Sequence, residues 1–310
     1  MKIKFFLLLS LTIILIPFLL SIIFIKEDKN NIFKIGHNSD LMIKVKRNDG
    51  NIINIAFEDY IIGVLAGEVP ANFEIEALKA QAVAARSYAL KKIEDSPNKK
   101  YNIVDNINNQ VYLDNNQLKN KWNTNYDKFI KKIKKAVNST NHEYLDYNGE
   151  VAQAFFFSTS VGKTENCEEV FQESLPYLKS VDSKWDKTSS PVFNEIKELN
   201  LIDFFKLLNI PYENNLNFEI LKTTSTGRIK EIKINNHFFN GNEIAKLLNL
   251  KSNFFKLEQI NNIIKITTTG FGHGVGMSQY GANGMAKEGY NYKQILNHYY
   301  NGTKIKKIKY

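Results

Sequence analysis

Cysteine is almost absent from this sequence, and that limits how the fold is held together. Cys167 is the only cysteine among 310 residues, so the chain forms no intramolecular disulfide and offers no thiolate pair for a structural zinc site. The histidines also lack the spacing of a metal-ligand pair. They are His37, His142, His237, His273 and His298. We therefore expect neither a metal nor another cofactor, and a fold that is stabilised by side-chain packing.

The glycine-rich motifs of nucleotide-binding proteins are absent as well. Residues 157–166, FSTSVGKTEN, lack the glycine spacing of a P-loop, and their hydroxyl and amide groups either bind sugars or stabilise a turn. Residues 270–284, GFGHGVGMSQYGANG, have Met277 in place of the third glycine of a dinucleotide fingerprint. His273 near Ser278 raises a serine hydrolase as an alternative, but the closing glycine of a nucleophile elbow is missing.

Residues 5–25 form a long apolar run without a charge, FFLLLSLTIILIPFLLSIIFI. As a helix that rises ~1.5 Å per residue, such a run spans the ~30 Å hydrocarbon layer of a membrane. Lys2 and Lys4 precede it, whereas the charges that follow it cancel, which favours a cytoplasmic N-terminus. We therefore expect a single-pass protein of the cell membrane. The alternative is a cleaved signal peptide, but the run exceeds the usual apolar core and no small-x-small cleavage site follows.

Composition divides the chain into three predicted parts. Residues 1–25 are a cytoplasmic tip and transmembrane anchor, and residues 26–40 are polar and without periodicity, as is typical of a spacer. Residues 41–310 are long enough for a catalytic ectodomain with its own core. Within them, the pattern of expected helices and strands changes over residues 194–265, which indicates either a subdomain or an insertion.

The net charge of +9 has two explanations. It favours an anionic partner such as a cell-wall polymer or lipid head groups, and it also arises from an ordinary solvated surface. Basic residues are not interleaved with aromatic residues as they are in nucleic-acid-binding segments, so we expect no nucleic-acid partner.

Residue periodicity predicts an α+β fold. Alternating apolar residues flank turns at Asp49-Gly50 and Asn148-Gly149, which indicates two antiparallel hairpins. Residues 74–93 are rich in alanine and have apolar residues three or four apart, which predicts a central helix. We expect the hairpins to pack on this helix and the glycine-rich segment to be a loop. In the sequence, this fold should follow the single N-terminal transmembrane helix. Further helices are predicted at 127–139, 202–208, 242–248 and 292–300.

Glu68 is a candidate catalytic acid. It stands in Gly67-Glu68-Val69-Pro70 as a lone carboxylate among apolar neighbours, before a proline that disfavours helical geometry at Val69. A carboxyl group that packs against apolar groups has a raised pKa, as a general acid near neutral pH requires. The alternative is a solvated loop residue.

Several segments, in this order, resemble the stage II sporulation protein D and amidase-enhancer family. The resemblance extends from about residue 41 to residue 303. Phe157 and Val161 depart from it, since the family commonly has histidine and glycine there. The segments are GEVPANFEIEALKAQAVAARSYAL, AFFFSTSVGKTENCEEVF, LPYLKSVDS, Ser225-Thr226-Gly227-Arg228 and GFGHGVGMSQYGANGMAKEGYNYKQILNHYYNGT.

The resemblance implies a membrane-anchored lytic transglycosylase. Such an enzyme cuts the glycan strands of peptidoglycan, preferring strands stripped of stem peptides, during engulfment in endospore formation. The catalytic glutamate of the family matches Glu68. Its site residues on the helix match Lys79, Gln81 and Arg86, and its hydroxyl-rich loop matches Ser158, Thr159 and Ser160. As further substrate-binding candidates we take Tyr88, His273, Gln279 and Tyr280.

The resemblance also implies partners and a location. The partners are a sporulation amidase or endopeptidase, stage II sporulation protein P, and an engulfment membrane protein, stage II sporulation protein M. The location is the engulfment membrane of the mother cell, with the C-terminal domain outside. One alternative is a non-catalytic wall-binding activator of a cell-wall amidase, as the enhancer relatives imply, and another is a structural tether between membrane and wall.

Overall fold

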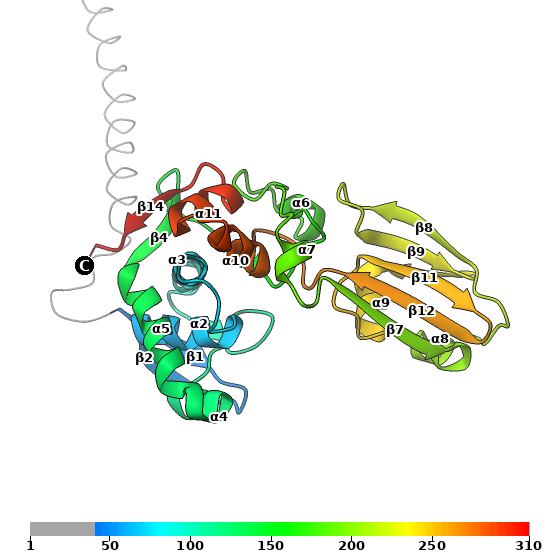
Figure 1. Ribbon diagram of the computed structural model, residues 1–310, viewed down its shortest axis with the longest axis horizontal. Coiled ribbons are helices and arrows are strands. Elements are labelled where there is room, and N and C mark those ends of the chain that lie inside the picture. Colours follow the sequence, from blue (N-terminus) through cyan, green and yellow to red (C-terminus); the bar gives the residue numbers. More distant parts are fainter. Residues whose placement is uncertain (1–40, 310) are drawn as a thin grey trace, which may run out of the picture. The chain divides into compact units, whose positions relative to one another are not determined.

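Helix α3 (Ile75–Glu94) lies at the centre of the helices that carry the candidate site (Figure 1). Alanine favours the helix and leaves little side chain around it, so neighbouring helices approach closely. Those neighbours are α2 (Phe57–Glu68), α5 (Tyr126–Ser139), α10 (Gln279–Lys287) and α11 (Tyr292–Tyr299). The helix predicted at 74–93 is confirmed, as are those at 127–139 and 292–300 within a residue at each end.

The computed structural model describes residues 41–309, and residues 42–306 belong to one unit. The first predicted hairpin is present: β1 (Met42–Lys46) pairs antiparallel with β2 (Ile52–Ala56), and β1 also pairs in parallel with β3 (Ile103–Val104). The second is present but short, with β4 (Glu143–Tyr147) antiparallel to β5 (Glu150–Val151) and next to β14 (Lys304–Lys307).

The predicted fold class needs two corrections. First, the fold is a mixture of helices with several small sheets of two or three strands, and some pairs are parallel, such as β6 (Phe156–Phe157) with β13 (Met277–Ser278). Alternation along a strand identifies a half-buried surface but not its partner, so it did not reveal these pairs. Second, no helix within 41–309 is long and apolar enough to cross a membrane, and the predicted anchor and spacer, residues 1–40, lie outside the described residues.

The glycine-rich segment 270–284 is a loop only in its first half, which also corrects the prediction. From Gln279 onward it is helix α10, whose first turn is capped by the Ser278 side chain, which accepts from the Gly281 amide at 3.2 Å. Glycine is present here because the helix packs closely against its neighbours. A Cβ atom at Gly281 would lie 2.2 Å from Oη of Tyr299.

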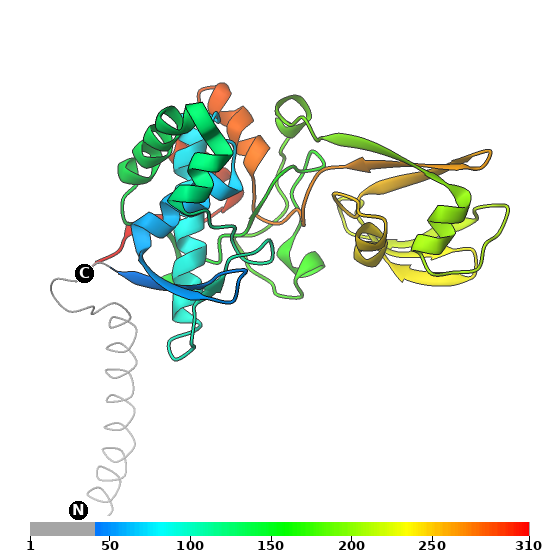
Figure 2. The ribbon, with the colours of Figure 1, turned by 90° about the horizontal axis from the view of Figure 1, so that it is seen from below.

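Residues 194–269 form the strands and helices at the right of Figure 2. They have a hydrophobic cluster of their own. Two antiparallel sheets, β10-β9-β8 and β11-β12-β7, contribute to it together with α8 (Leu201–Leu207) and α9 (Gly241–Leu247). The strands are β7 (Asn194–Asn200), β8 (Phe218–Thr223), β9 (Ile229–Ile234), β10 (His237–Asn240), β11 (Phe255–Ile260) and β12 (Ile263–Thr269). The limits 194–265 for a subdomain stay a prediction.

An ion pair between a buried arginine and a partly exposed glutamate links α3 to α2. Arg86 is fully buried, and its Nε and Nη2 donate to Oε1 and Oε2 of Glu58 at 2.9 and 2.8 Å. Its Nη1 donates to the carbonyl oxygen of Glu143 at 2.8 Å, which adds β4 to the connection. The guanidinium group therefore holds three elements together from inside the protein.

Replacing Glu58 with alanine should strongly destabilise the fold. The substitution leaves the Arg86 charge buried without its partner, and loss of one member of such a pair lowers the free energy of unfolding by about 3 kcal/mol. Urea unfolding measures the change. Asp59→Ala, at the exposed neighbour in the same helical turn, is the control and should stay within about 1 kcal/mol of the parent. Equal losses in both variants would contradict a structural role of the ion pair.

Candidate functional site

A cavity of about 590 Å³ opens where α2 ends. The residues around it come from α2, α3, the loop before α4 (Asn115–Trp122), the β6 strand and the glycine-rich segment. Large cavities with a few convergent polar groups are the usual binding sites of proteins. The polar side chains in its lining are Glu68, Tyr88, Asn108, Asn109, Ser158, His273, Gln279 and Tyr280.

Glu68 is the last residue of α2, and its carboxyl group is held by two donors. The Val111 amide donates to Oε1 at 2.6 Å, and the Gln279 side chain forms a second hydrogen bond. The residue before it must be small, because a Cβ atom at Gly67 would lie 2.5 Å from the carbonyl oxygen of Val111. The glycine thus lets the loop approach closely enough for its amide to reach Glu68.

Burial raises the pKa of Glu68 to about 7. The hydrogen bonds from Val111 and Gln279 and the positive charge of Lys121 act in the opposite direction, so desolvation is the dominant effect. Aromatic side chains form much of the surrounding wall: Tyr88, Phe155, Phe156, Phe157, Phe171, Phe271 and Tyr280. A carboxyl group with this pKa both donates and accepts a proton near neutral pH.

His273 lies in the wall of the cavity as a neutral ring. Burial and the nearby charge of Arg228 lower the pKa of His273 to about 4. Its Nδ1 accepts from the Val275 amide at 3.1 Å, and its centroid lies 5.2 Å from that of Phe171 and 5.6 Å from that of Phe157. This ring packs and orients the loop and carries no charge at neutral pH.

Asp186, at the start of α7 (Asp186–Ser189), fixes the hydroxyl-rich loop to the beginning of α10. Its carboxylate accepts from the hydroxyl groups of Ser160 at 2.7 Å, Ser183 at 2.6 Å and Ser278 at 2.6 Å, and from the Ser160 amide at 3.1 Å. Because Ser278 precedes Gln279, this carboxylate also sets where the Gln279 side chain meets Glu68.

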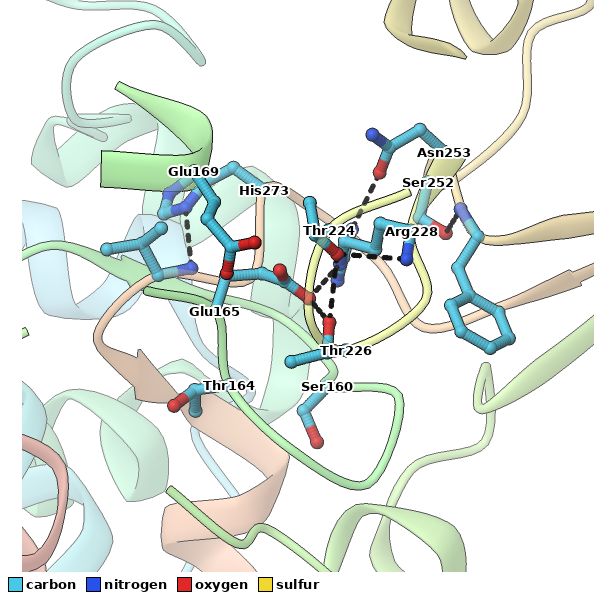
Figure 3. A network of polar contacts seen from close by, with 12 residues as sticks. Ser160, Thr164, Glu165, Glu169, Thr224, Thr226, Arg228, Ser252, Asn253 and His273 are labelled. Carbon is cyan, nitrogen blue, oxygen red and sulfur yellow. Dashed lines mark hydrogen bonds and ion pairs between the residues drawn. The ribbon is translucent and has the colours of Figure 1, made fainter. Parts of the chain in front are cut away.

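A second buried network holds the glycine-rich loop (Figure 3). Glu165 and Arg228 form a buried ion pair at 3.1 Å, and the Thr226 hydroxyl donates to Glu165. Nη1 of Arg228 donates to the Gly272 carbonyl oxygen at 2.8 Å. A Cβ atom at Gly274 would lie 2.7 Å from Cγ of Glu165, so the loop passes close to the pair.

The structure brings together some of the predicted site residues and not others. Glu68, Tyr88, Ser158, His273, Gln279 and Tyr280 line the cavity. The remaining candidates, Lys79, Gln81, Arg86, Thr159 and Ser160, are not among its lining residues.

The remaining candidates have other contacts. Lys79 pairs with Glu76 at 2.7 Å, and Arg86 pairs with Glu58. Thr159 lies beside Ser190, with their hydroxyl oxygens 2.7 Å apart, and Ser160 is bound by Asp186. Gln81 is buried, and its amide atoms have no hydrogen-bond partner within the described residues.

Sequence reasoning missed the loop that donates to Glu68 and the aspartate that orients α10. Val111 and Asp186 have no local pattern that marks them, because their roles depend on contacts between segments far apart in the chain. Gly67 was visible as a small residue beside the candidate acid. Within residues 41–309, no group of three or more histidine, cysteine or acidic side chains could hold a metal ion.

Glu68→Gln should stabilise the protein at about pH 8 and have much less effect at about pH 5. The pKa of Glu68 is raised from 4.5 to about 7 in the folded protein, so the folded state binds this proton more tightly than the unfolded chain. The free energy of unfolding therefore falls as the pH rises between these values, by roughly 3 kcal/mol in total. Glutamine does not titrate and keeps an oxygen for the Val111 amide.

Urea unfolding of parent and variant across this pH range measures the difference. Glu74→Gln, at an exposed residue outside the cavity, is the control and should not show the gain at high pH. A gain for Glu68→Gln that does not vary with pH would contradict the raised pKa.

Comparison with known proteins shows which family this chain resembles. Residues 46–147 match a family model described as Stage II sporulation protein. The chain is similar to the amidase enhancer of Bacillus subtilis (strain 168), with 31% identity over 297 residues that cover 78% of this chain and 40% of that protein.

Two further relatives match over most of both chains. Stage II sporulation protein D of Bacillus subtilis (strain 168) is 41% identical over 262 residues, which cover 82% of this chain and 76% of that protein. Stage II sporulation protein D of Bacillus amyloliquefaciens is 39% identical over 273 residues, which cover 86% and 79%. With these levels of identity over most of its length, the chain belongs to the stage II sporulation protein D family, whose members take part in sporulation.

Proposed function

We propose that the protein is a peptidoglycan lytic transglycosylase in which Glu68 is the catalytic acid and base. The observation that carries this proposal is a single carboxyl group with a pKa of about 7 in a largely aromatic cavity. Membership of a family linked to the processing of cell-wall peptidoglycan supports the substrate class. The cavity also has amide and hydroxyl side chains that suit hydrogen bonding to sugars.

The reaction needs one proton donor that afterwards becomes a proton acceptor. Protonated Glu68 gives its proton to the glycosidic oxygen as the bond from that oxygen to C1 of muramic acid breaks. The Glu68 carboxylate then takes the proton of the C6 hydroxyl group, whose oxygen bonds to C1. The products are a shortened strand with a 1,6-anhydro end and a released strand with a free hydroxyl group, and Glu68 is protonated again.

The number of acids in the cavity favours this reaction over hydrolysis. Glycoside hydrolases usually have two carboxylates on either side of the scissile bond, because water must be activated or a covalent intermediate formed. Among the described residues that line this cavity, Glu68 is the only acid. An attacking hydroxyl group within the same sugar is already held close to C1, so a second carboxylate is not needed.

Gln279 and Val111 assist proton transfer by Glu68. Both donate to the ionised carboxyl group, so they stabilise the charge that forms on Glu68 once its proton has been transferred. We further propose that the enzyme acts on peptide-free strands in the envelope of the sporulating cell during engulfment. An amidase such as stage II sporulation protein P would prepare those strands, and stage II sporulation protein M would be a membrane partner.

Replacement of Glu68 by glutamine should greatly slow product formation. The parent protein, incubated with peptide-free glycan strands, should release fragments with 1,6-anhydro ends, and Glu68→Gln should be slower by at least about a hundredfold because it has no proton to transfer. Mass spectrometry of the products measures this. Glu74→Gln removes an exposed carboxylate outside the cavity and should cut at the parental rate. Anhydro products from Glu68→Gln at the parental rate would disprove the assignment.

The rate of cleavage should fall as the pH rises above about 7. The first step requires protonated Glu68, and the fraction of protein in that form decreases through the pKa of about 7. Initial rates at saturating glycan between about pH 5 and about pH 9 test this. A rate that keeps rising across that range would contradict Glu68 as the acid.

A second function is favoured by the amidase-enhancer relative. In it, the protein binds the wall and activates a cell-wall amidase without cutting glycan. The two functions differ in whether the activity requires Glu68. If neither the parent protein nor Glu68→Gln releases anhydro products, while both accelerate a sporulation amidase to the same extent, the activator function replaces the proposed one.

A further inference from the structure

A second cavity of about 610 Å³ lies directly behind one wall of the first. The two cavities share the lining residues Phe171, Gly272 and His273. The second is formed mainly by α6 (Cys167–Val170) and the two residues after it, the start of β9, α9, and the segment before β11. The two cavities therefore lie next to each other across this wall, and a linear polymer bound at Glu68 has the second cavity beside it.

The two cavities differ in charge. No lysine or arginine is among the described residues that line the first cavity, whereas Lys230, Lys246 and Lys251 line the second. Two acids also line the second, but both are engaged. Glu168 pairs with Lys179, and Glu169 accepts from the Ser225 amide at 2.7 Å and from its hydroxyl group at 2.6 Å. Burial acts to raise the pKa of Glu169, but hydrogen bonds from Ser225 and Asn166 and the nearby charge of Lys230 outweigh it and lower the pKa, so this acid stays ionised and offsets Lys230. The positive charge that the second cavity presents to a ligand is therefore that of Lys246 and Lys251.

Lys251 lies at the border between the cavities. Its Nζ is 4.9 Å from the ring centroid of Phe271, a residue of the first cavity, while Lys251 itself lines the second. Its carbonyl oxygen accepts from the Gly272 amide at 3.0 Å, so the shared wall fixes the backbone of the lysine. An ammonium group thus lies at the wall that the two cavities share.

The chemistry of the strand supplies a matching group. Every second sugar of a peptidoglycan strand bears a lactyl group, whose carboxyl is an amide while the stem peptide is attached. Removal of the peptide leaves a carboxylate, so a stripped strand has a regular series of negative charges. Asn242 and Asn249, which also line the second cavity, offer amide groups that suit the acetamido groups of the sugars.

We propose that the second cavity is a subsite that recognises stripped glycan strands, in which Lys246 and Lys251 bind lactyl carboxylates beyond the cleavage point. This inference rests on the proposed function, since it assumes that the first cavity holds the scissile bond. It explains the proposed preference for peptide-free strands by the carboxylates that the strand gains when its stem peptides are removed. Lys79 and Arg86, the cations that sequence reasoning assigned to the substrate, pair with Glu76 and Glu58 instead.

The test compares two substrates and four forms of the full chain. The substrates are peptide-free glycan strands with free lactyl carboxylates and the same strands after conversion of the carboxylates to methylamides. The test variant is Lys246→Ala/Lys251→Ala. The control, Lys206→Ala/Lys256→Ala, removes two exposed lysines from α8 and β11, neither of which lines a cavity.

The parent protein should cut the acidic strands with a kcat/KM roughly tenfold above that for the amidated strands, as two partly exposed ion pairs allow. The test variant should lower this ratio to about one, and the control variant should keep it. Lys246→Arg/Lys251→Arg should restore it, because the charge is retained. A parental ratio in the test variant, or a parental ratio of one, would overturn the inference.

Binding separates this inference from the proposed function. In a Glu68→Gln background the strands stay intact, and the same ratio can be measured as a ratio of Kd values for the two substrates. If the parent protein cuts neither substrate, the proposed function fails. The Kd ratio of the test variant still decides whether the second cavity recognises lactyl carboxylates.

Discussion

The site depends most on the buried carboxylate of Asp186. Burial raises its pKa, while hydrogen bonds from Ser183, Ser278 and Ser160 act against the rise, so this carboxylate is kept in place by the donors that surround it. Those donors belong to the hydroxyl-rich loop, the segment before α7 and the N-cap of α10. The position of Gln279, the next residue after Ser278, follows from this arrangement, and with it one of the two hydrogen bonds to Glu68. The serine and threonine residues that look like sugar ligands in the sequence therefore act largely as the support of the site.

The buried pair of Glu165 and Arg228 plays the corresponding role for the wall between the cavities. A buried pair of this kind adds less to stability than its charges imply, because both ions lose their hydration. The pair instead acts by positioning the segments around it. The guanidinium group also donates to the Gly272 carbonyl oxygen and to Oδ1 of Asn253, so it connects the glycine-rich loop to the segment that precedes β11. Burial, together with the charge of Arg228, lowers the pKa of His273, which keeps that ring neutral in the wall of the Glu68 cavity.

Local patterns in the sequence predicted the elements that depend on local interactions. The central helix follows from the alanine-rich period, and the first hairpin from the Asp49-Gly50 turn, with Gly50 at φ +88°. Helix α10 was missed because its glycines resemble those of a loop, although they are needed for close packing against neighbours such as Tyr299. The parallel pair of β6 and β13 was missed because it joins distant segments, and no local period encodes a partner. Glu68 was identified from its apolar neighbours and from the resemblance, whereas its donor Val111 depends on a tertiary contact.

Under the proposed function, the separation of charge between the cavities fits what an acid catalyst requires. A lysine or arginine in contact with Glu68 would favour the ionised carboxyl group and lower its pKa, which would remove the proton donor near neutral pH. Lys121 has such an effect, but burial outweighs it. A site that must also bind an anionic strand therefore needs its cations at a distance from the acid. The pairing of Arg86 with Glu58 in the interior and the grouping of lysines in the second cavity both meet this requirement. Under the proposed function, the lysines lie beyond the shared wall, while Glu68 stays in the aromatic cavity that would hold the bond to be cut.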